Sequence, residues 1–153
     1  MKAIIQRVSS ASLKVDGELI SEIGVGFLVL LGVYAGDSEK DADYLAAKTA
    51  ALRVFKDEQD KMNLALGDIG GELLVVSNFT ICADTEKSGN RPSFILAEKP
   101  ERANELYEHF MAQLKNAGKT VKPGVFGADM KIAVVNDGPV TIILDSAPKG
   151  FNK

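Results

Sequence analysis

Cysteine and histidine are almost absent from this chain of 153 residues, which has a single cysteine, Cys82, and a single histidine, His109. One cysteine cannot form an internal disulfide and fits a reducing compartment, so we expect a cytoplasmic protein. One histidine and one cysteine also cannot supply the cluster of ligands that a structural zinc ion needs. We therefore expect neither a metal nor a cofactor.

Long apolar runs and an excess of positive charge are also missing. No run reaches the roughly 20 residues of a membrane-spanning helix, and the N-terminus has no signal-peptide pattern, so no membrane partner is expected. The formal net charge is −3, from 18 Lys and Arg against 21 Asp and Glu. This balance argues against DNA as a partner and against strong non-specific binding of nucleic acid. It leaves open a small pocket that binds only the tip of an RNA.

The remaining composition is that of an ordinary globular domain, with 46% hydrophobic and 25% charged residues. The length suits one domain over residues 1–153. Hairpin-spaced strand patterns and two separate helical patterns predict an α+β fold, with a mainly antiparallel sheet or open barrel. Helices are expected after Ser38, with Asp41 as its capping partner, and from about Pro100 to Gly118. Strands are expected at residues 3–8, 11–15, 19–23, 25–34, 73–82, 119–122, 131–135 and 139–145.

The stretch VNDGPVT at residues 135–141 is unusual for a turn. Asn, Asp, Gly and Pro in succession normally mark a plain turn, but Pro139 leads directly into an apolar strand that then lacks a donor. A Gly-Pro bond loses little by being cis. From the residues alone, a hairpin turn with a trans proline is the favoured interpretation, and a fixed cis-proline is the alternative.

A second stretch, VVSNFTI at residues 75–81, carries polar side chains in the middle of a predicted strand. A buried strand should be apolar throughout and a half-buried one should alternate, yet Ser77, Asn78 and Thr80 break both patterns. Either these side chains satisfy backbone groups at the end of the strand, or they form a functional site. The residues alone favour neither interpretation.

Together, Ser-Asn-Phe-Thr at 77–80 and Asn-Asp-Gly-Pro-Val-Thr at 136–141 resemble the two signature motifs of the D-aminoacyl-tRNA deacylases. The resemblance extends to MKAIIQRV at 1–8, RPSF at 91–94 and GADM at 127–130, and so covers nearly the whole chain in matching order. One departure is visible, because the family usually has Gln at the position of Asn78. The shorter amide keeps the chemistry but loses one methylene of reach.

The resemblance implies a fold and a mode of action. The fold would be a barrel-like roll of antiparallel sheets covered by two helices, in a homodimer. The substrate would be the 3′ end of aminoacyl-tRNA, held in a pocket lined by the catalytic stretch. The Phe79 and Thr80 N–H groups would face the scissile carbonyl, Ser77 and Asn78 would keep the shape of the pocket, and the terminal 2′-hydroxyl of the RNA would assist attack by water.

The resemblance also implies how D- and L-amino acids are distinguished. Gly138-Pro139 would be cis and would enter the site of the other subunit, where its carbonyls reject an L-amino acid. We expect Arg7 beside this dipeptide as a support. The wall around the terminal adenosine would come from residues of the loop before the second motif, namely Phe126, Gly127 and Met130. Phosphate contacts are expected from Lys87, Arg91 and Lys149.

The sequence shows no convincing pair of a side-chain nucleophile and a base. Cys82 and His109 could be imagined as a pair, but the thiol lies in an apolar strand and the imidazole in mid-helix. Thr80 has no neighbouring base. Three functions stay open: a hydrolase of D-aminoacyl-tRNA and glycyl-tRNA, a deacylase of the same fold with relaxed chirality that acts on L-aminoacyl-tRNA, and a non-catalytic dimeric module that binds RNA ends or small molecules.

Overall fold

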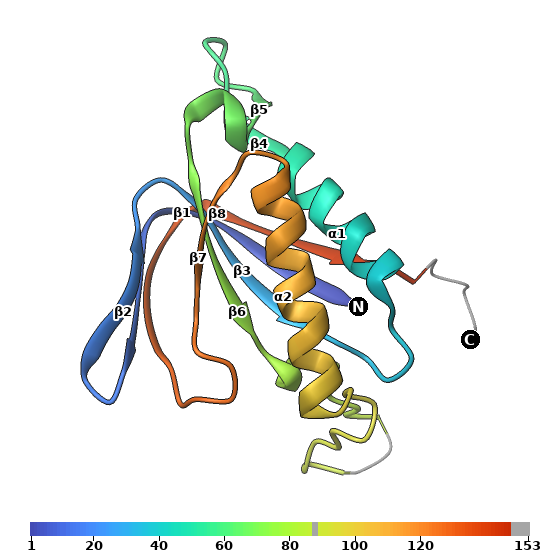
Figure 1. Ribbon diagram of the computed structural model, residues 1–153. Coiled ribbons are helices and arrows are strands. Elements are labelled where there is room, and N and C mark those ends of the chain that lie inside the picture. Colours follow the sequence, from blue (N-terminus) through green and yellow to red (C-terminus); the bar gives the residue numbers. More distant parts are fainter. Residues whose placement is uncertain (87–88, 148–153) are drawn as a thin grey trace.

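A six-stranded sheet forms the body of the protein. The computed structural model describes residues 1–86 and 89–147 (Figure 1). In these residues the strand order is β2-β1-β3-β6-β7, and β8 also pairs with β1. This confirms the predicted α+β class. The strands of the sheet are β1 (Lys2–Val15), β2 (Glu18–Ile23), β3 (Gly26–Gly32), β6 (Glu72–Ser77), β7 (Thr120–Pro123) and β8 (Lys131–Asp145).

Strands β1 and β8 are longer than the sequence predicted. The sequence predicted two strands at residues 3–8 and 11–15, and two more at 131–135 and 139–145 with a turn between them. The first two form the single strand β1, and the last two form the single strand β8. The two strands pair antiparallel, with Lys2 opposite Asp145 at one end and Lys14 opposite Lys131 at the other. The register shifts twice, between Gln6 and Ser10. β8 has more residues than β1 between the pairs Gln6–Thr141 and Val8–Asn136, and a bulge accommodates them. The pairing with β1 therefore continues on both sides of the sequence that predicted a turn.

Strand β6 differs from the rest because both of its neighbours, β3 and β7, run parallel to it. Parallel strands are covered on both faces, which explains why all four residues from Leu73 to Val76 are buried. The three ladders of β1, with β2, β3 and β8, are antiparallel. The mainly antiparallel sheet that was predicted therefore also contains a parallel part, around β6.

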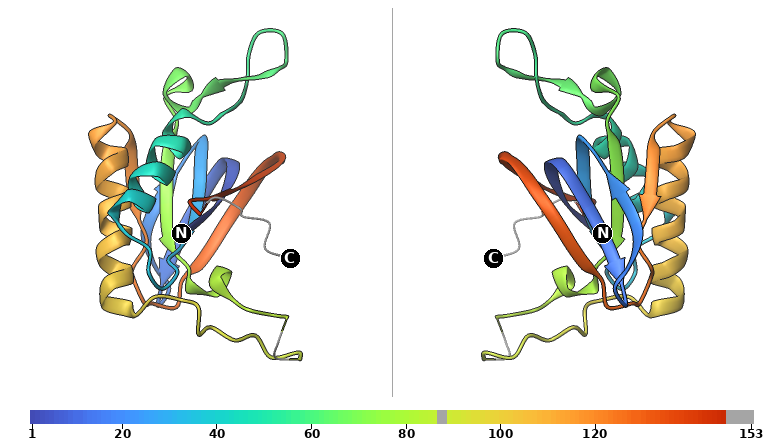
Figure 2. Two further views of the ribbon diagram at one scale, coloured as in Figure 1. Left: turned by 90° about the vertical axis from the view of Figure 1, so that its right-hand side faces the viewer. Right: turned by 90° about the vertical axis from the view of Figure 1, so that its left-hand side faces the viewer.

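Two helices cover one face of this sheet (Figure 2). Helix α1 (Glu39–Ala51) begins after Ser38, whose N–H and hydroxyl both donate to the Asp41 carboxylate at 2.9 and 3.0 Å. Helix α2 (Pro100–Asn116) has proline in its first turn and ends before Gly118, which has φ 77°. Both predicted helices are confirmed, together with their capping residues.

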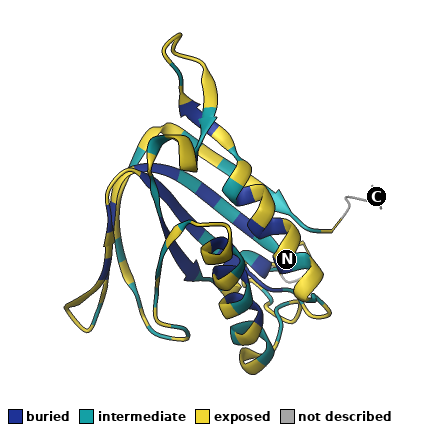
Figure 3. Ribbon diagram, turned by 45° about the horizontal axis from the view of Figure 1, so that its top comes forward, coloured by how far each residue is buried: buried dark blue, intermediate teal, exposed yellow. Residues whose placement is uncertain are grey.

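The two faces of the sheet bury different apolar clusters. On β3, the alternate residues Phe27, Val29 and Leu31 join the large cluster beneath the helices. In Figure 3 the buried residues gather in the strands behind the helices and on the helix sides that face them. Leu28 points the other way, into a smaller cluster made by β1, β2, β3 and β6.

The edge strands β2 and β7 close the roll around the smaller cluster without forming a ladder. Side chains join them instead. The Ser21 hydroxyl donates to the Pro123 carbonyl at 2.6 Å, and the Lys122 ammonium donates to the Glu22 carbonyl at 2.6 Å. The result is a nearly closed roll with one seam.

A separate hairpin of β4 (Arg53–Lys56) and β5 (Met62–Ala65) projects beyond this body in both views of Figure 2. Two short 3-10 helices, η1 (Leu66–Ile69) and η2 (Phe79–Cys82), precede and follow β6. None of the helices in the described ranges is long and apolar enough to cross a membrane.

Candidate active site

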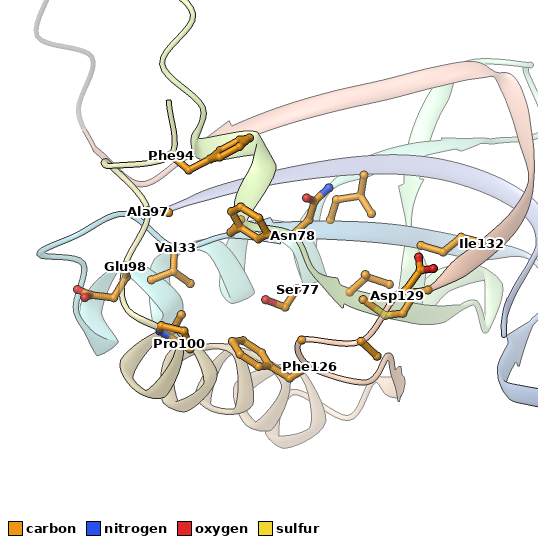
Figure 4. Close-up of a pocket in the computed structure, with 17 residues that line it drawn as sticks. Val33, Ser77, Asn78, Phe94, Ala97, Glu98, Pro100, Phe126, Asp129 and Ile132 are labelled. Carbon is orange, nitrogen blue, oxygen red and sulfur yellow. The ribbon is translucent and has the colours of Figure 1, made fainter. Parts of the chain in front are cut away.

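A pocket of about 650 Å³ opens where β6 ends (Figure 4). Its walls come from the ends of β3 and β6, the turn after β6, the segment that leads into α2, and the loop between β7 and β8. Six of the ten residues predicted for the site line this pocket: Ser77, Asn78, Phe79, Phe126, Gly127 and Met130. The structure thus brings together two stretches that lie about fifty positions apart in the sequence.

The strand that carries the first motif ends at Ser77, although the sequence predicted that it would continue to Cys82. Ser77 still pairs with Leu31, and the Asn78 N–H donates to the Leu31 carbonyl at 2.8 Å. The chain then turns into η2. Asn78 causes this turn, because its side-chain oxygen accepts the Thr80 N–H at 3.2 Å and caps the 3-10 helix. Short polar side chains compete in this way with the ladder of a sheet.

The same amide oxygen also fixes the Thr80 hydroxyl, which donates to it at 2.5 Å. Thr80 does not line the pocket but adjoins it through this bond. An amide oxygen is not a general base, so the bond does not activate the hydroxyl as a nucleophile. The Thr80 N–H is already engaged, whereas the Phe79 N–H is the first amide of the turn, a position that has no acceptor inside a helix.

Two phenylalanines form the outer rim. Phe79 and Phe94 are both exposed, and their ring centroids lie 5.1 Å apart with the rings nearly perpendicular. Phe94 was not predicted as a site residue. The signal for it is the run Phe94-Ile95-Leu96, three apolar residues in an otherwise polar loop, all of them exposed. Exposed apolar residues beside a pocket are typical of a binding surface.

The opposite wall is the loop that leads into β8. Phe126, Gly127 and Met130 lie on it, and Gly127 has φ 76°, a backbone conformation that side chains rarely allow. Helix α2 adds a third wall that was missed, with Pro100 and Ala103 from its first turn. Pro100 correctly predicted where the helix begins, but it gave no sign that this end of the helix lines the pocket with Ser77.

Gly138 and Pro139 lie outside the pocket of their own chain. They are exposed, in the middle of β8, and the bond between them is cis, the alternative that the resemblance implied. Gly138 has φ 133°, and a Cβ there would lie 2.9 Å from the Val140 nitrogen. The Val140 N–H donates to the Asn136 side-chain oxygen at 3.0 Å, which closes a small loop around the dipeptide.

Arg7 supports this dipeptide and does not line the pocket. It is buried rather than on the surface. Its Nε donates to the Asp137 carbonyl at 3.1 Å, and its Nη1 donates to the Val54 carbonyl at 2.7 Å. The Asp137 carboxylate lies 3.5 Å from the same Nε. One buried guanidinium therefore joins the base of the β4–β5 hairpin to the residue before Gly138.

Cys82 and His109 have other partners. Burial raises the pKa of the Cys82 thiol to about 11, and its Sγ contacts the Val33 carbonyl. The His109 Nε2 lies 2.7 Å from Asp43, between the two helices. No cluster of three metal-ligating side chains occurs in the described residues. Lys87 and Lys149 lie outside those residues, and Arg91 is exposed and does not line the pocket.

Comparisons with known proteins agree with this arrangement. The chain matches the family model described as D-Tyr-tRNA(Tyr) deacylase over residues 4–145. A D-aminoacyl-tRNA deacylase of Ruegeria pomeroyi is 56% identical over 145 residues, 95% of this chain and 99% of that protein. The solved structure of the c-Myc DNA Unwinding Element Binding Protein is 42% identical, with a TM-score of 0.90 over 97% of this chain and 100% of the other. A probable eukaryotic D-amino acid tRNA deacylase has a TM-score of 0.79 at 14% identity over 94% and 98% of the two chains, which shows a shared fold.

Proposed function

This chain belongs to the D-Tyr-tRNA(Tyr) deacylase family, and on that premise we propose that it hydrolyses the ester of D-aminoacyl-tRNA, and of glycyl-tRNA, in the cytoplasm. The products are free tRNA and the amino acid. The observation that supports this most is the capped turn at the end of β6, whose first amide belongs to the pocket residue Phe79. The hydroxyl in the pocket lining is that of Ser77, and among the described residues no histidine or lysine lines the pocket to activate it. An aminoacyl ester is already activated, so positioning and oxyanion stabilisation suffice.

Only the 3′ end of the RNA enters the pocket. A volume of about 650 Å³ lies within the range of roughly 300–1,000 Å³ that is typical of small-molecule sites. The terminal adenosine stacks against Phe126 and contacts Gly127 and Met130, since unpaired bases bind aromatic side chains. A small contact area of this kind is compatible with a net charge of −3.

Water attacks the ester carbonyl carbon, and the Phe79 N–H stabilises the oxyanion that forms. The bond from the carbonyl carbon to the ribose 3′-oxygen then breaks, and the proton lost by water reaches this oxygen through the neighbouring 2′-hydroxyl. Ser77 and Asn78 keep the shape of the site. The Thr80 N–H can join as a second donor only if Asn78 releases it. A well-placed donor of this kind contributes about 3–4 kcal/mol to the transition state.

The homodimer completes the site. Gly138-Pro139 is exposed and lies outside its own pocket, beside the exposed apolar residues Val134 and Val135 of the same strand. An apolar strand of this type is suited to cover by a second copy. The dipeptide of one subunit then stands against the substrate α-carbon in the other. Backbone held by Arg7 and Asn136 cannot rotate away, so an L side chain clashes.

Two alternatives remain testable beside this proposal, a deacylase that accepts L-amino acids and a dimeric module that binds without catalysis. The experiment compares release of amino acid from D-tyrosyl-, L-tyrosyl- and glycyl-tRNA at equal enzyme. We expect cleavage of the D-tyrosyl and glycyl esters and not of the L-tyrosyl ester. Cleavage of all three supports relaxed chirality, and cleavage of none supports the binding module. Duplex DNA is a useful competitor, because one structural relative is named for binding DNA, and we expect it not to compete.

A further inference from the structure

The pocket exists because β7 leaves β6 before β6 ends. The parallel ladder of these strands stops at the pair Val75 and Pro123. Beyond this pair, β6 continues to Ser77, on one wall of the pocket. The segment that follows β7 continues through Gly124 to Phe126, on the opposite wall. The width of the pocket therefore depends on the geometry of this fork.

The hydroxyl of Tyr107, from helix α2, lies at the fork. It donates to the Val75 carbonyl at 2.8 Å and accepts from the Gly124 N–H at 3.2 Å. The same N–H also donates to the Val75 carbonyl at 2.9 Å, so the three groups form a closed set of hydrogen bonds. The Tyr107 ring reaches the pocket wall as well, with its centroid 6.1 Å from that of Phe126.

Packing alone does not require this hydroxyl. Tyr107 is 1% exposed and belongs to the apolar core beneath the helices, where phenylalanine would fill the same space. A buried hydroxyl is unfavourable unless it is hydrogen-bonded. Burial raises the pKa of Tyr107 to about 12, so the hydroxyl stays a donor at any ordinary assay pH.

The two branches of the fork are not held equally. The β6 branch is also fixed from its other edge, where Ser77 pairs with Leu31 and the Asn78 N–H donates to the Leu31 carbonyl. In the part of the chain that the structure describes, the branch through Gly124 has no ladder on its other edge, where the Ser21 bond to the Pro123 carbonyl joins it to β2 before the fork. It packs closely under a pocket residue, because a Cβ on Gly124 would lie 2.8 Å from the Met130 Sδ. Loosening the fork should therefore move the wall of Phe126 and Met130 and leave Phe79 in place.

We propose that Tyr107 is a positioning residue that holds this wall at the spacing required by the terminal nucleoside of the substrate. The proposal rests on the function given above, in which that wall contacts the terminal adenosine. It assigns to Tyr107 an effect on substrate binding and not on the chemical step.

The test is Tyr107→Phe, which keeps the ring and removes both hydroxyl bonds. We expect KM for D-tyrosyl-tRNA to rise by up to about tenfold, the upper end of the net effect of a typical hydrogen bond, because the Gly124 N–H keeps its bond to the Val75 carbonyl. The inhibition constant of adenosine 5′-monophosphate should rise by a similar factor. The value of kcat should stay within about twofold, because the β6 branch keeps its bonds to β3.

Two controls separate positioning from general loosening. Tyr44→Phe removes an exposed hydroxyl from α1 and should change neither constant. Leu114→Ala removes core volume from α2 about two helical turns beyond Tyr107, and should lower thermal stability while KM stays unchanged. An unchanged KM in Tyr107→Phe overturns the proposal, as does an equal rise in KM in the leucine variant.

A second variant keeps the test valid if Tyr107→Phe does not fold. Gly124→Ala leaves the hydroxyl bonds possible but pushes on Met130, and should also raise KM with kcat retained. A wild-type KM in this variant contradicts the proposal. Failure of the wild-type protein to cleave D-tyrosyl-tRNA would refute the proposed function instead, and binding of adenosine 5′-monophosphate would still compare the variants.

Discussion

At the scale of single residues, Asn78 has the largest influence on the site, because one amide oxygen ends a strand and engages both polar groups of Thr80. The family resemblance implied two backbone donors, from Phe79 and Thr80. With asparagine at position 78, the second donor is bonded within the turn. Glutamine, which the resemblance implies at this position, is one methylene longer and is not among the preferred N-cap residues, so the second donor would not be engaged by the same cap.

Replacing Asn78 by aspartate tests the electrostatics of the turn. Aspartate keeps an acceptor for both Thr80 bonds and caps as well as asparagine, but it adds a negative charge beside the Phe79 N–H. We expect kcat for D-tyrosyl-tRNA to fall about 100-fold or more, the scale of a lost oxyanion donor, with the melting temperature nearly unchanged. Thr80→Val is the control, and losing one hydroxyl bond should cost less than about tenfold. Equal losses in both variants would show that the added charge has no specific effect on the rate.

Cys82 predicts a pH dependence of stability. Its pKa is raised from 9.0 to about 11 by burial, so the folded protein holds this proton more tightly than the unfolded chain. The stabilisation is complete below pH 9 and is lost as the pH rises through 11. In Cys82→Ala, the fall in unfolding free energy over this range should be shallower, by at most about 1.4 kcal/mol per pH unit. Parallel curves from urea unfolding at pH 8 to 11 would contradict this.

At the scale of elements, the helices were predictable and the strand limits were not. Ser38 with Asp41, and Pro100 with Gly118, are local signals that lie within a few residues of the helix ends they mark. By contrast, β8 runs through Asn-Asp-Gly-Pro because β1 lies opposite it, more than a hundred residues away in the sequence. Strand β6 was predicted too long because a local interaction, the bond from the Thr80 N–H to the Asn78 side chain, ends it at Ser77.

The seam between β2 and β7 gives a prediction at this scale. Ser21→Ala removes the donor to the carbonyl of Pro123, an exposed residue to which water has access. We expect a loss of about 0.5–1.5 kcal/mol in the free energy of unfolding, the net value of one hydrogen bond, measured by urea denaturation. Ser9→Ala, at an exposed position on β1, is the matched control and should be neutral. An equal effect of the two changes would mean that the seam contributes nothing specific.

At the scale of the whole molecule, the resemblance named ten candidate site residues, and the structure places six of them in one pocket. Phe126 and Met130 meet Ser77 because β7 is parallel to β6, and no local pattern shows that neighbourhood. Arg7 was expected beside Gly138-Pro139 and is bonded to the residue before it. Phe94, Pro100 and Ala103 were missed, because their place depends on how the loop and α2 pack over β6.

The last prediction concerns the link between assembly and chirality. If Gly138-Pro139 acts in the pocket of a second copy, a monomer keeps its own Phe79 donor and adenosine wall but loses the wall at the α-carbon. Val135→Lys puts a charge on the exposed apolar part of β8, and we expect it to give a monomer in light scattering at micromolar concentration. Ile20→Lys, on the exposed part of β2, is the control and should leave the assembly unchanged.

A pocket that merely fits a side chain distinguishes substrates by roughly 10–200-fold, whereas backbone that cannot move can exclude one enantiomer almost fully. The ratio of cleavage rates for D-tyrosyl- and L-tyrosyl-tRNA should therefore be large in the wild type and in Ile20→Lys, and should approach one in the monomer, even if both rates fall. A monomer that retains the full ratio would show that selectivity arises within one chain, and that the dipeptide does not act across subunits.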